Sequence, residues 1–430
     1  MRLAVVSPFL DRSHGTERCI VEQIERLARL PGWEIHVYSQ RVEQVAGVSR
    51  DFSPGQIVWH KIPAIPGPHL LQYVWWFAAN HVYRWRDRRS GKVRPDLVYS
   101  PGINCADADV IAVHIVFREF YRRVRGELRL RKLPLASWPR TIHRKLYYRL
   151  IMRLERWIYR DCRNRLAAVS RQAARQLEEQ FQRTGVAVIP NAVDAEKFRP
   201  AAREQERSSA RRRFGFADAD FVLLLIGNDW KNKGLEALLR AMADCADLPL
   251  RLLVVGGDDA APYQSILARL GLGERVRFAD PCADVLPFYA AADAYAGPSL
   301  EETFGLPVLE AMACGLPVIA SAQSGVSELI RDGVDGFILK DGADFAGLAQ
   351  RIRQLCQDGG LCRRIGENAT RTAQAHTWDR NAREMGGVLA EALECKRQRF
   401  SPGKETERGE SGSQGLPGGR TGRRNDQEDR

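Results

Sequence analysis

The chain has 430 residues, of which 44% are hydrophobic, and its formal net charge is +12. This length is too great for one compact core and suits two folded domains, while no apolar run reaches the roughly 18 residues that a membrane-spanning helix needs. The 9 cysteines are scattered without a C-x-x-C pair, which argues against a disulfide framework or a zinc site and favours reduced thiols in a cytosolic protein.

The first half of the chain alternates apolar strands with helices. Runs rich in valine and isoleucine that alternate with amphipathic helices are typical of a parallel sheet covered on both faces. The first apolar run is too short for a signal peptide, so we interpret it as a buried strand. The predicted strands are Leu3–Ser7, Trp33–Ser39, Asp96–Ser100, Val110–Val113, Arg165–Val169 and Val186–Pro190, and a helix is predicted over about residues 16–30.

A second series of strands and helices follows. Two such series, each restarting the pattern, predict an α/β protein with two Rossmann-like domains that face one another, at 1–186 and 214–377, joined by a charged linker over 187–213. We expect a final amphipathic helix over 378–395 and a glycine-rich, disordered tail over 396–430. The predicted strands of the second series are Phe221–Gly227, Leu250–Gly256, Arg275–Phe278, Ala294–Ala296 and Pro317–Ala320, and its helices are Lys233–Met242, Ala261–Leu270, Val285–Ala291 and Leu306–Ala313.

The segment Pro298–Ser321 is the most informative about chemistry. Gly305 precedes a helix that is predicted to begin near Leu306, and the free N–H groups at a helix N-terminus suit a phosphate. Glu302 lies in the loop, and Glu310 lies eight residues later on the helix face toward the same cleft. A carboxylate can accept hydrogen bonds from two neighbouring sugar hydroxyls. Two glutamates near a helix start can equally complement the helix dipole, so both interpretations stay open at this point.

The full string P-S-x-x-E-x-F-G-L-P-x-x-E-A-M-A-C-G-x-P-V resembles the E-x7-E signature of the retaining family-4 glycosyltransferases. The resemblance implies the GT-B fold, with an acceptor domain first, a nucleotide-sugar domain second and the C-terminal helix packed back on the first domain. It also implies that Glu310 binds the nucleotide ribose and that Glu302 lies beside the donor sugar and its phosphates. Phe304, Gly305 and Leu306 belong to the same donor-binding loop, and neither a metal nor a cofactor is implied.

Two further segments resemble loops that contain glycine in this family. His14-Gly15-Thr16-Glu17-Arg18 is similar to the family's G-G-x-E-R loop near the diphosphate and the acceptor, with Gly15 as its remaining glycine. Ile189–Asp194 is similar to the family's P-N-G-V-D crossing between domains, with Ala192 in place of the glycine.

The candidate donor-phosphate cations lie within a third segment, Ile226–Gly234, which is similar to a string in the lipopolysaccharide-core glucosyltransferases. Lys233 matches the family's diphosphate lysine, while Asn228 replaces its arginine. Lys231 could supply the second charge, although without the bidentate fork of arginine. These lysines could also simply solvate the start of a helix.

His114 follows the predicted strand Val110–Val113 and resembles the family's strand-end histidine that contacts the donor sugar. A histidine at this position of a strand can also be a structural residue with its hydrogen bonds satisfied. We favour the site interpretation because of the other matches, and we group His114 with Glu302 as the candidate catalytic residues.

The positive charge is concentrated in Phe117–Arg165, which holds 16 lysines and arginines against four acidic residues. Aromatic residues interleave with these cations. This pattern indicates a peripheral face that binds an anionic membrane, although basic and aromatic residues can also bind nucleic acid or form a solvated helix face. We expect membrane binding, no nucleic acid, and a location on the cytoplasmic face of the cell membrane.

The resemblance thus implies a retaining, metal-independent transferase, which we expect to move a hexose-type sugar from a nucleotide-diphosphate sugar to a lipid-linked or glycan acceptor of the cell envelope. A dinucleotide-dependent oxidoreductase would need G-x-G-x-x-G between the first strand and helix, and Val5–Gly15 lacks it. A non-catalytic scaffold or an RNA-binding protein that uses residues 117–165 is the alternative.

Overall fold

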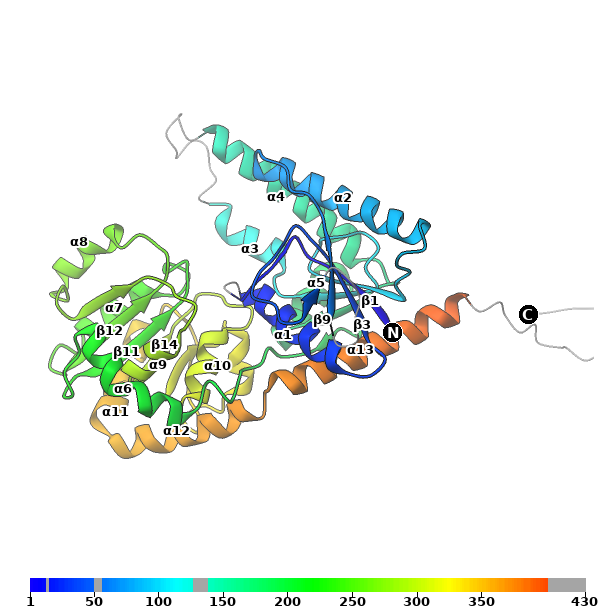
Figure 1. The fold of residues 1–430 in the computed structure, drawn as a ribbon. Helices are drawn as coiled ribbons and strands as arrows, with labels where there is room; N and C mark the ends of the chain where they lie inside the picture. Colours follow the sequence, from blue (N-terminus) through cyan, green and yellow to red (C-terminus); the bar gives the residue numbers. More distant parts are fainter. Residues whose placement is uncertain (13–14, 50–55, 127–137, 401–430) are drawn as a thin grey trace, which may run out of the picture.

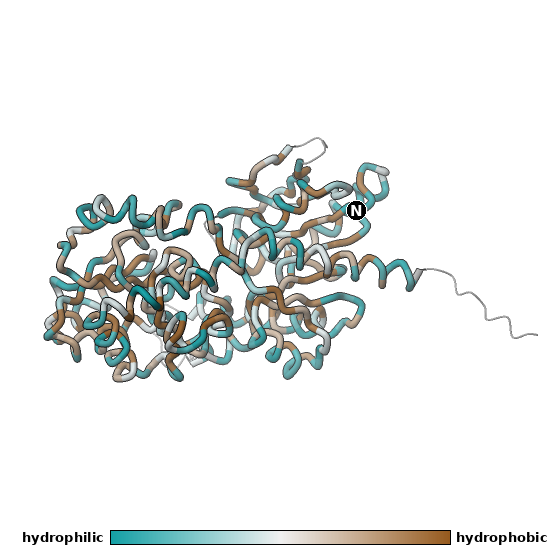
Figure 2. The backbone as a smooth tube through the Cα atoms, turned by 90° about the horizontal axis from the view of Figure 1, so that it is seen from below, coloured by the Kyte–Doolittle hydropathy of each residue, from teal (hydrophilic) through white to brown (hydrophobic). Residues whose placement is uncertain are grey.

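The computed structural model describes residues 1–12, 15–49, 56–126 and 138–400, which form two α/β lobes side by side (Figure 1). Each lobe contains a parallel sheet with helices on its faces, so the predicted α/β class with two Rossmann-like domains is confirmed. Figure 2 shows the hydrophobic segments in the interior of each lobe, with hydrophilic segments around them. Within the described ranges, no helix is both long and apolar enough to cross a bilayer.

The first domain is built on an eight-stranded sheet with the order β10-β9-β8-β7-β1-β3-β6-β5, in which all pairs are parallel. Strand β1 is central and its residues Leu3–Val6 are fully buried, because helices cover both sheet faces. The strands are β1 (Arg2–Val6), β3 (Glu34–Ser39), β5 (Val48–Ser49), β6 (Ile57–Lys61), β7 (Leu97–Pro101), β8 (Val110–Val113), β9 (Arg165–Ala168) and β10 (Ala187–Val188), and β2 (Phe9–Leu10) pairs separately with β4 (Arg41–Val42). The helices are α1 (Gly15–Arg29), α2 (His69–Arg89), α3 (Phe117–Val124), α4 (Trp138–Tyr159) and α5 (Arg171–Phe181).

The second domain has a six-stranded parallel sheet with the order β13-β12-β11-β14-β15-β16. Its two faces are packed by separate clusters of buried residues. The strands are β11 (Phe221–Ile226), β12 (Leu250–Val255), β13 (Val276–Ala279), β14 (Ala294–Gly297), β15 (Val318–Ser321) and β16 (Phe337–Leu339). The helices are α6 (Pro200–Phe214), α7 (Leu235–Ala243), α8 (Ala261–Arg269), α9 (Leu286–Ala291), α10 (Leu306–Ala313), the 3-10 helix η3 (Gly325–Leu329), α11 (Phe345–Gln357), α12 (Gly359–Gln374) and α13 (Trp378–Phe400).

The segment that we expected to link the domains, 187–213, contains most of α6, and this helix packs on the second domain. Arg207 and Arg211 of α6 form ion pairs with Asp293, at 2.5 and 3.0 Å. The sequence pattern did not indicate a packed helix here, because arginine contacts hold α6 in place and the helix has no continuous apolar stripe. The second half of the expected linker therefore belongs to the second domain.

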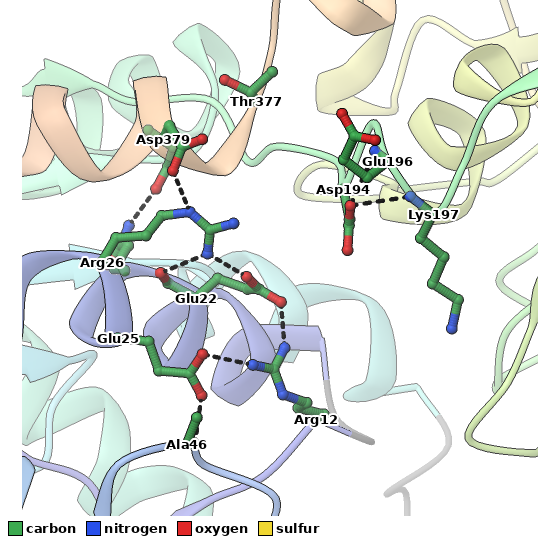
Figure 3. A network of polar contacts seen from close by, with 12 residues as sticks. Arg12, Glu22, Glu25, Arg26, Ala46, Asp194, Glu196, Lys197, Thr377 and Asp379 are labelled. Carbon is green, nitrogen blue, oxygen red and sulfur yellow. Dashed lines mark hydrogen bonds and ion pairs between the residues drawn. The ribbon is translucent and has the colours of Figure 1, made fainter. Parts of the chain in front are cut away.

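Helix α13 leaves the second domain and packs along α1 of the first, as predicted (Figure 1). Met385 and Leu389 enter the core of the first domain, and Arg26 of α1 binds Asp379 at 2.7 Å (Figure 3). The predicted start of the disordered tail at residue 396 is too early, since helix α13 continues to Phe400. Its extra turn is stabilised by an ion pair between Lys396 and Asp109 at 2.8 Å, which a composition argument does not detect. The rest of the predicted tail, 401–430, lies outside the described residues.

Candidate active site

Both sheets reverse their strand order at one point. In the first domain the chain returns to pair β7 with β1, and in the second it returns to pair β14 with β11. Ligands of open α/β sheets bind at the carboxyl ends of the strands at such points. A cavity of about 460 Å³ lies there, lined by residues that follow β1 and β8 in the first domain and β11 and β14 in the second. The cavity is therefore formed by both domains.

The start of α10 forms one wall of this cavity. Gly305 has a φ of 100°, and a Cβ atom at this position would lie 2.8 Å from Ser324 Oγ, so only glycine fits without strain. Pro307 lies in the first turn of α10, where a missing N–H costs nothing, and buried Phe304 anchors the loop before it. Leu306 packs against Cys19 of α1 and Trp378 of α13. This helix N-terminus thus faces the cavity and the first domain.

Lys233 and Glu302 form an ion pair within the cavity, with the two side chains 12% and 23% exposed. Lys233 lies across Gly227 at the end of β11, which has a φ of 136°. A Cβ atom at Gly227 would lie 2.7 Å from Lys233 Cε, so the glycine makes room for the lysine. The ammonium group and the loop carboxylate therefore reach the cavity together.

Glu310 lies in the first turns of α10 with a side chain that is only 5% exposed. One carboxylate oxygen, Oε1, pairs with Arg18 of the first domain at 2.7 Å, and the other accepts a hydrogen bond from the Tyr289 hydroxyl at 2.7 Å. Burial raises the pKa of Tyr289 well above its ordinary value, so the phenol stays protonated and donates. Glu310 is thus a buried anion held by one cation and one neutral donor.

His114 lies directly after β8 and also lines the cavity. Burial lowers the pKa of its imidazole to about 4, so the ring is neutral at neutral pH. Its Nε2 atom has no hydrogen-bond partner among the described residues. A buried ring nitrogen that lacks a partner is available to a ligand that enters the cavity.

The cavity is lined by nine of the ten residues that the sequence predicted for the site. Lys231 differs, because it is exposed and does not line the cavity. Asn228 does line it, but its Oδ1 atom accepts a hydrogen bond from the Gly257 N–H at 2.8 Å and joins the ends of β11 and β12. The nine are Gly15, His114, Asn228, Lys233, Glu302, Phe304, Gly305, Leu306 and Glu310. His14 of the predicted glycine loop lies outside the described residues.

Two arginines that line the cavity, Arg12 and Arg18, were not predicted from the sequence. Arg18 belongs to the string that we compared with the family's first loop, but only Gly15 was selected from it. Arg12 precedes α1 and binds Glu22 and Glu25 of that helix, as Figure 3 shows. In the part of the chain that the structure describes, no three His, Cys, Asp or Glu side chains are grouped as a metal site would need.

Both domains match models of known protein families. The model described as "Glycosyltransferase Family 4" matches residues 13–197, and "Glycosyl transferases group 1" matches residues 206–372. Together the two models account for most of both domains. The chain belongs to the family-4 glycosyltransferases.

This chain is 33% identical over 256 residues to the D-inositol 3-phosphate glycosyltransferase of Salinispora tropica, a match that covers 55% of this chain and 53% of the relative. It is 37% identical over 263 residues to the enzyme of the same name from Geodermatophilus obscurus, with 56% of each chain covered. The matches span about half the length of these curated relatives.

Solved structures share the fold of this chain over most of its length. The lipopolysaccharide-biosynthesis glycosyltransferase WaaG has a TM-score of 0.70 at 19% identity, over 90% of this chain and 99% of that structure. HepE of Anabaena, solved with UDP and glucose, has a TM-score of 0.63 at 21% identity, over 90% and 99%. The predicted GT-B fold is therefore confirmed.

Proposed function

We propose that this protein transfers a hexose-type sugar from a nucleotide-diphosphate sugar to a glycan or lipid-linked acceptor. The proposal rests on one observation: Lys233, Glu302 and Glu310 meet in a single cavity beside the N-terminus of α10. A diphosphate needs cations and free N–H groups, while a ribose and a sugar need hydrogen-bond acceptors, and this cavity offers both kinds of group.

In the proposed complex, the diphosphate binds the N–H groups at the start of α10 and the Lys233 ammonium. Glu310 accepts hydrogen bonds from the ribose hydroxyls, and Glu302 and neutral His114 lie beside the donor sugar. Lysine and the helix N-terminus then stabilise the charge that develops on the leaving diphosphate, which is our reason to propose a metal-independent reaction.

For the chemical step we propose retention at the anomeric carbon, as in the family that Pro298–Ser321 resembles. The acceptor hydroxyl attacks on the face that the leaving group vacates, so the new C–O bond forms as the bond to the diphosphate breaks. The departing phosphate oxygen takes the proton of the acceptor hydroxyl. No side chain is assigned as a nucleophile.

We also propose that the acceptor is membrane-associated and that the protein binds the cytoplasmic face of the cell membrane. Helices α2 and α4 lie side by side over the first domain (Figure 1). Trp85 of α2 and Trp157 of α4 are 58% and 61% exposed, and Arg149 and Arg153 of α4 are exposed as well. Exposed tryptophans together with cations support an interface with anionic headgroups.

Release of nucleoside diphosphate tests the proposed function. The protein is incubated with UDP, GDP and ADP conjugates of hexoses, with and without membrane extract as the acceptor source, and the freed diphosphate is measured. We expect acceptor-stimulated release from one donor class that persists in EDTA, with a product of unchanged anomeric configuration by NMR. No release from any donor, together with RNA binding that needs the basic segment, would instead favour the non-catalytic alternative.

A further inference from the structure

The cavity must balance the charge of its ligand. A sugar diphosphate carries a negative charge on each phosphoryl group, and Lys233 neutralises one of them. Asn228 is uncharged and bonded to Gly257, and Lys231 does not line the cavity. A second cation therefore has to come from another element.

Arg12 and Arg18 are the remaining lysine or arginine side chains among the described residues that line the cavity. Arg12 is fixed by two carboxylates of α1, Glu22 and Glu25, which are only 8% and 6% exposed. Glu22 also pairs with Arg26, but Glu25 has no other cation among the ion pairs of the described residues, so moving Arg12 would leave a buried carboxylate unpaired, which is strongly unfavourable. Arg12 is therefore a structural residue, and Arg18 is the arginine that a ligand can recruit.

Arg18 is held at the nucleotide site by Glu310, with its side chain 20% exposed. Glu310 lies about one helical turn, roughly 6 Å, from the N-terminus of α10 at Leu306. A long arginine side chain can cover such a distance, and its planar fork matches phosphate oxygens in a bidentate manner. The Arg18 guanidinium can thus reach the position at which the diphosphate is proposed to bind.

We propose that Arg18 is the second diphosphate-binding cation and that it is supplied across the cleft by the first domain. Without donor, each carboxylate of the site is paired with a cation, Glu310 with Arg18 and Glu302 with Lys233. When the donor binds, its hydroxyls take the carboxylates and its phosphates take the cations. After this exchange the donor contacts both domains, because Arg18 belongs to the first domain and Lys233 to the second. This inference rests on the proposed function, since it needs a nucleotide-diphosphate donor.

The experiment compares ligands with and without phosphates. Arg18→Met keeps an unbranched apolar stem of similar length to that of arginine and removes the charged guanidinium group. Affinities for UDP, GDP and ADP are measured by calorimetry, and those for uridine, guanosine and adenosine by ligand-observed NMR. We expect Arg18→Met to weaken the preferred diphosphate by about tenfold or more, as the loss of a charge-assisted pair requires, and to leave the matching nucleoside unchanged or tighter. Arg18→Lys should recover part of the loss.

Arg29→Met on the exposed end of α1 is the matched control and should bind all ligands like the wild type. An Arg18→Met variant that binds the diphosphate within twofold of the wild type overturns the inference, and so does an equal loss for nucleoside and diphosphate. Glu310→Ala and Lys233→Ala distinguish a failure of the Arg18 role from a failure of the proposed function. If these two variants weaken the diphosphate and Arg18→Met does not, only the role of Arg18 fails. If none of the three has an effect, the proposed function fails as well.

Discussion

Arg18 on α1 and Glu310 on α10 form an ion pair of 2.7 Å across the cleft between the two domains. Both side chains are largely buried, and neither domain alone contains the pair. A second contact joins the two domains through hydrogen bonds, since Glu328 of η3 accepts from the backbone N–H groups of Arg171 and Gln172 at the start of α5. The domains therefore meet at the candidate site through charged groups that a ligand can rearrange.

Replacement of Glu310 or Lys233 by alanine should abolish most turnover. Each variant removes a charged group that binds ribose or diphosphate in the proposed complex, so we expect a loss of about 100-fold or more in diphosphate release. The measurement is turnover with the preferred donor, alongside circular dichroism for the fold. Glu236→Ala on the exposed surface of α7 should keep full activity. Normal turnover in either site variant would contradict the assignment.

Gly305→Ala should reduce both stability and donor affinity. The residue would be strained at a φ of 100°, and its Cβ would crowd Ser324 Oγ. We expect a destabilisation of about 1–3 kcal/mol in denaturant titration and weaker nucleotide binding. Gly271→Ala also places a side chain at positive φ, 66°, but in open space far along the chain from the site. That variant should lose stability while its nucleotide affinity stays at the wild-type value.

The pH dependence of stability should reveal His114. Its pKa is about 4 in the folded protein because of burial, against about 6.5 in an unfolded chain. Between these values the unfolded state binds more protons, so stability must fall as the pH drops from about 6.5 to 4. His114→Asn removes this contribution, which amounts to about 3 kcal/mol at most. The unfolding free energies of the wild type and of His114→Asn, measured at several pH values, should therefore approach each other or cross as the pH falls. A difference that stays constant with pH would disprove the shifted pKa of His114.

Removal of two exposed arginines of α4 should weaken membrane binding. The double variant Arg149→Ser/Arg153→Ser should lose about 1 kcal/mol of membrane-binding free energy for each charge removed, which for both charges together is about 30-fold in partitioning. Flotation with anionic and neutral liposomes measures it. Arg212→Ser with Arg213→Ser changes the net charge equally on α6 and should bind anionic liposomes like the wild type. Equal recovery of the wild type with both liposome types would remove the membrane proposal.

The sequence alone determined the local features of the site. The predicted bounds of α10 and β8 agree with the structure, because Gly305 marks the start of the helix and the four apolar residues Val110–Val113 mark the strand. By contrast, α2 was not predicted, since Trp76 is buried while Trp75 and Trp85 are exposed and its apolar residues do not form one stripe.

Only the tertiary structure decided which charges meet. Lys231 and Lys233 are two residues apart in a loop that is flanked by two residues with positive φ angles, Asp229 at 59° and Gly234 at 78°, yet of the two lysines only Lys233 lines the cavity. The partner of Glu310 comes from the other end of the chain. Periodicity and motifs report on neighbouring residues, whereas an ion pair between domains depends on how two separately folded sheets are placed against one another.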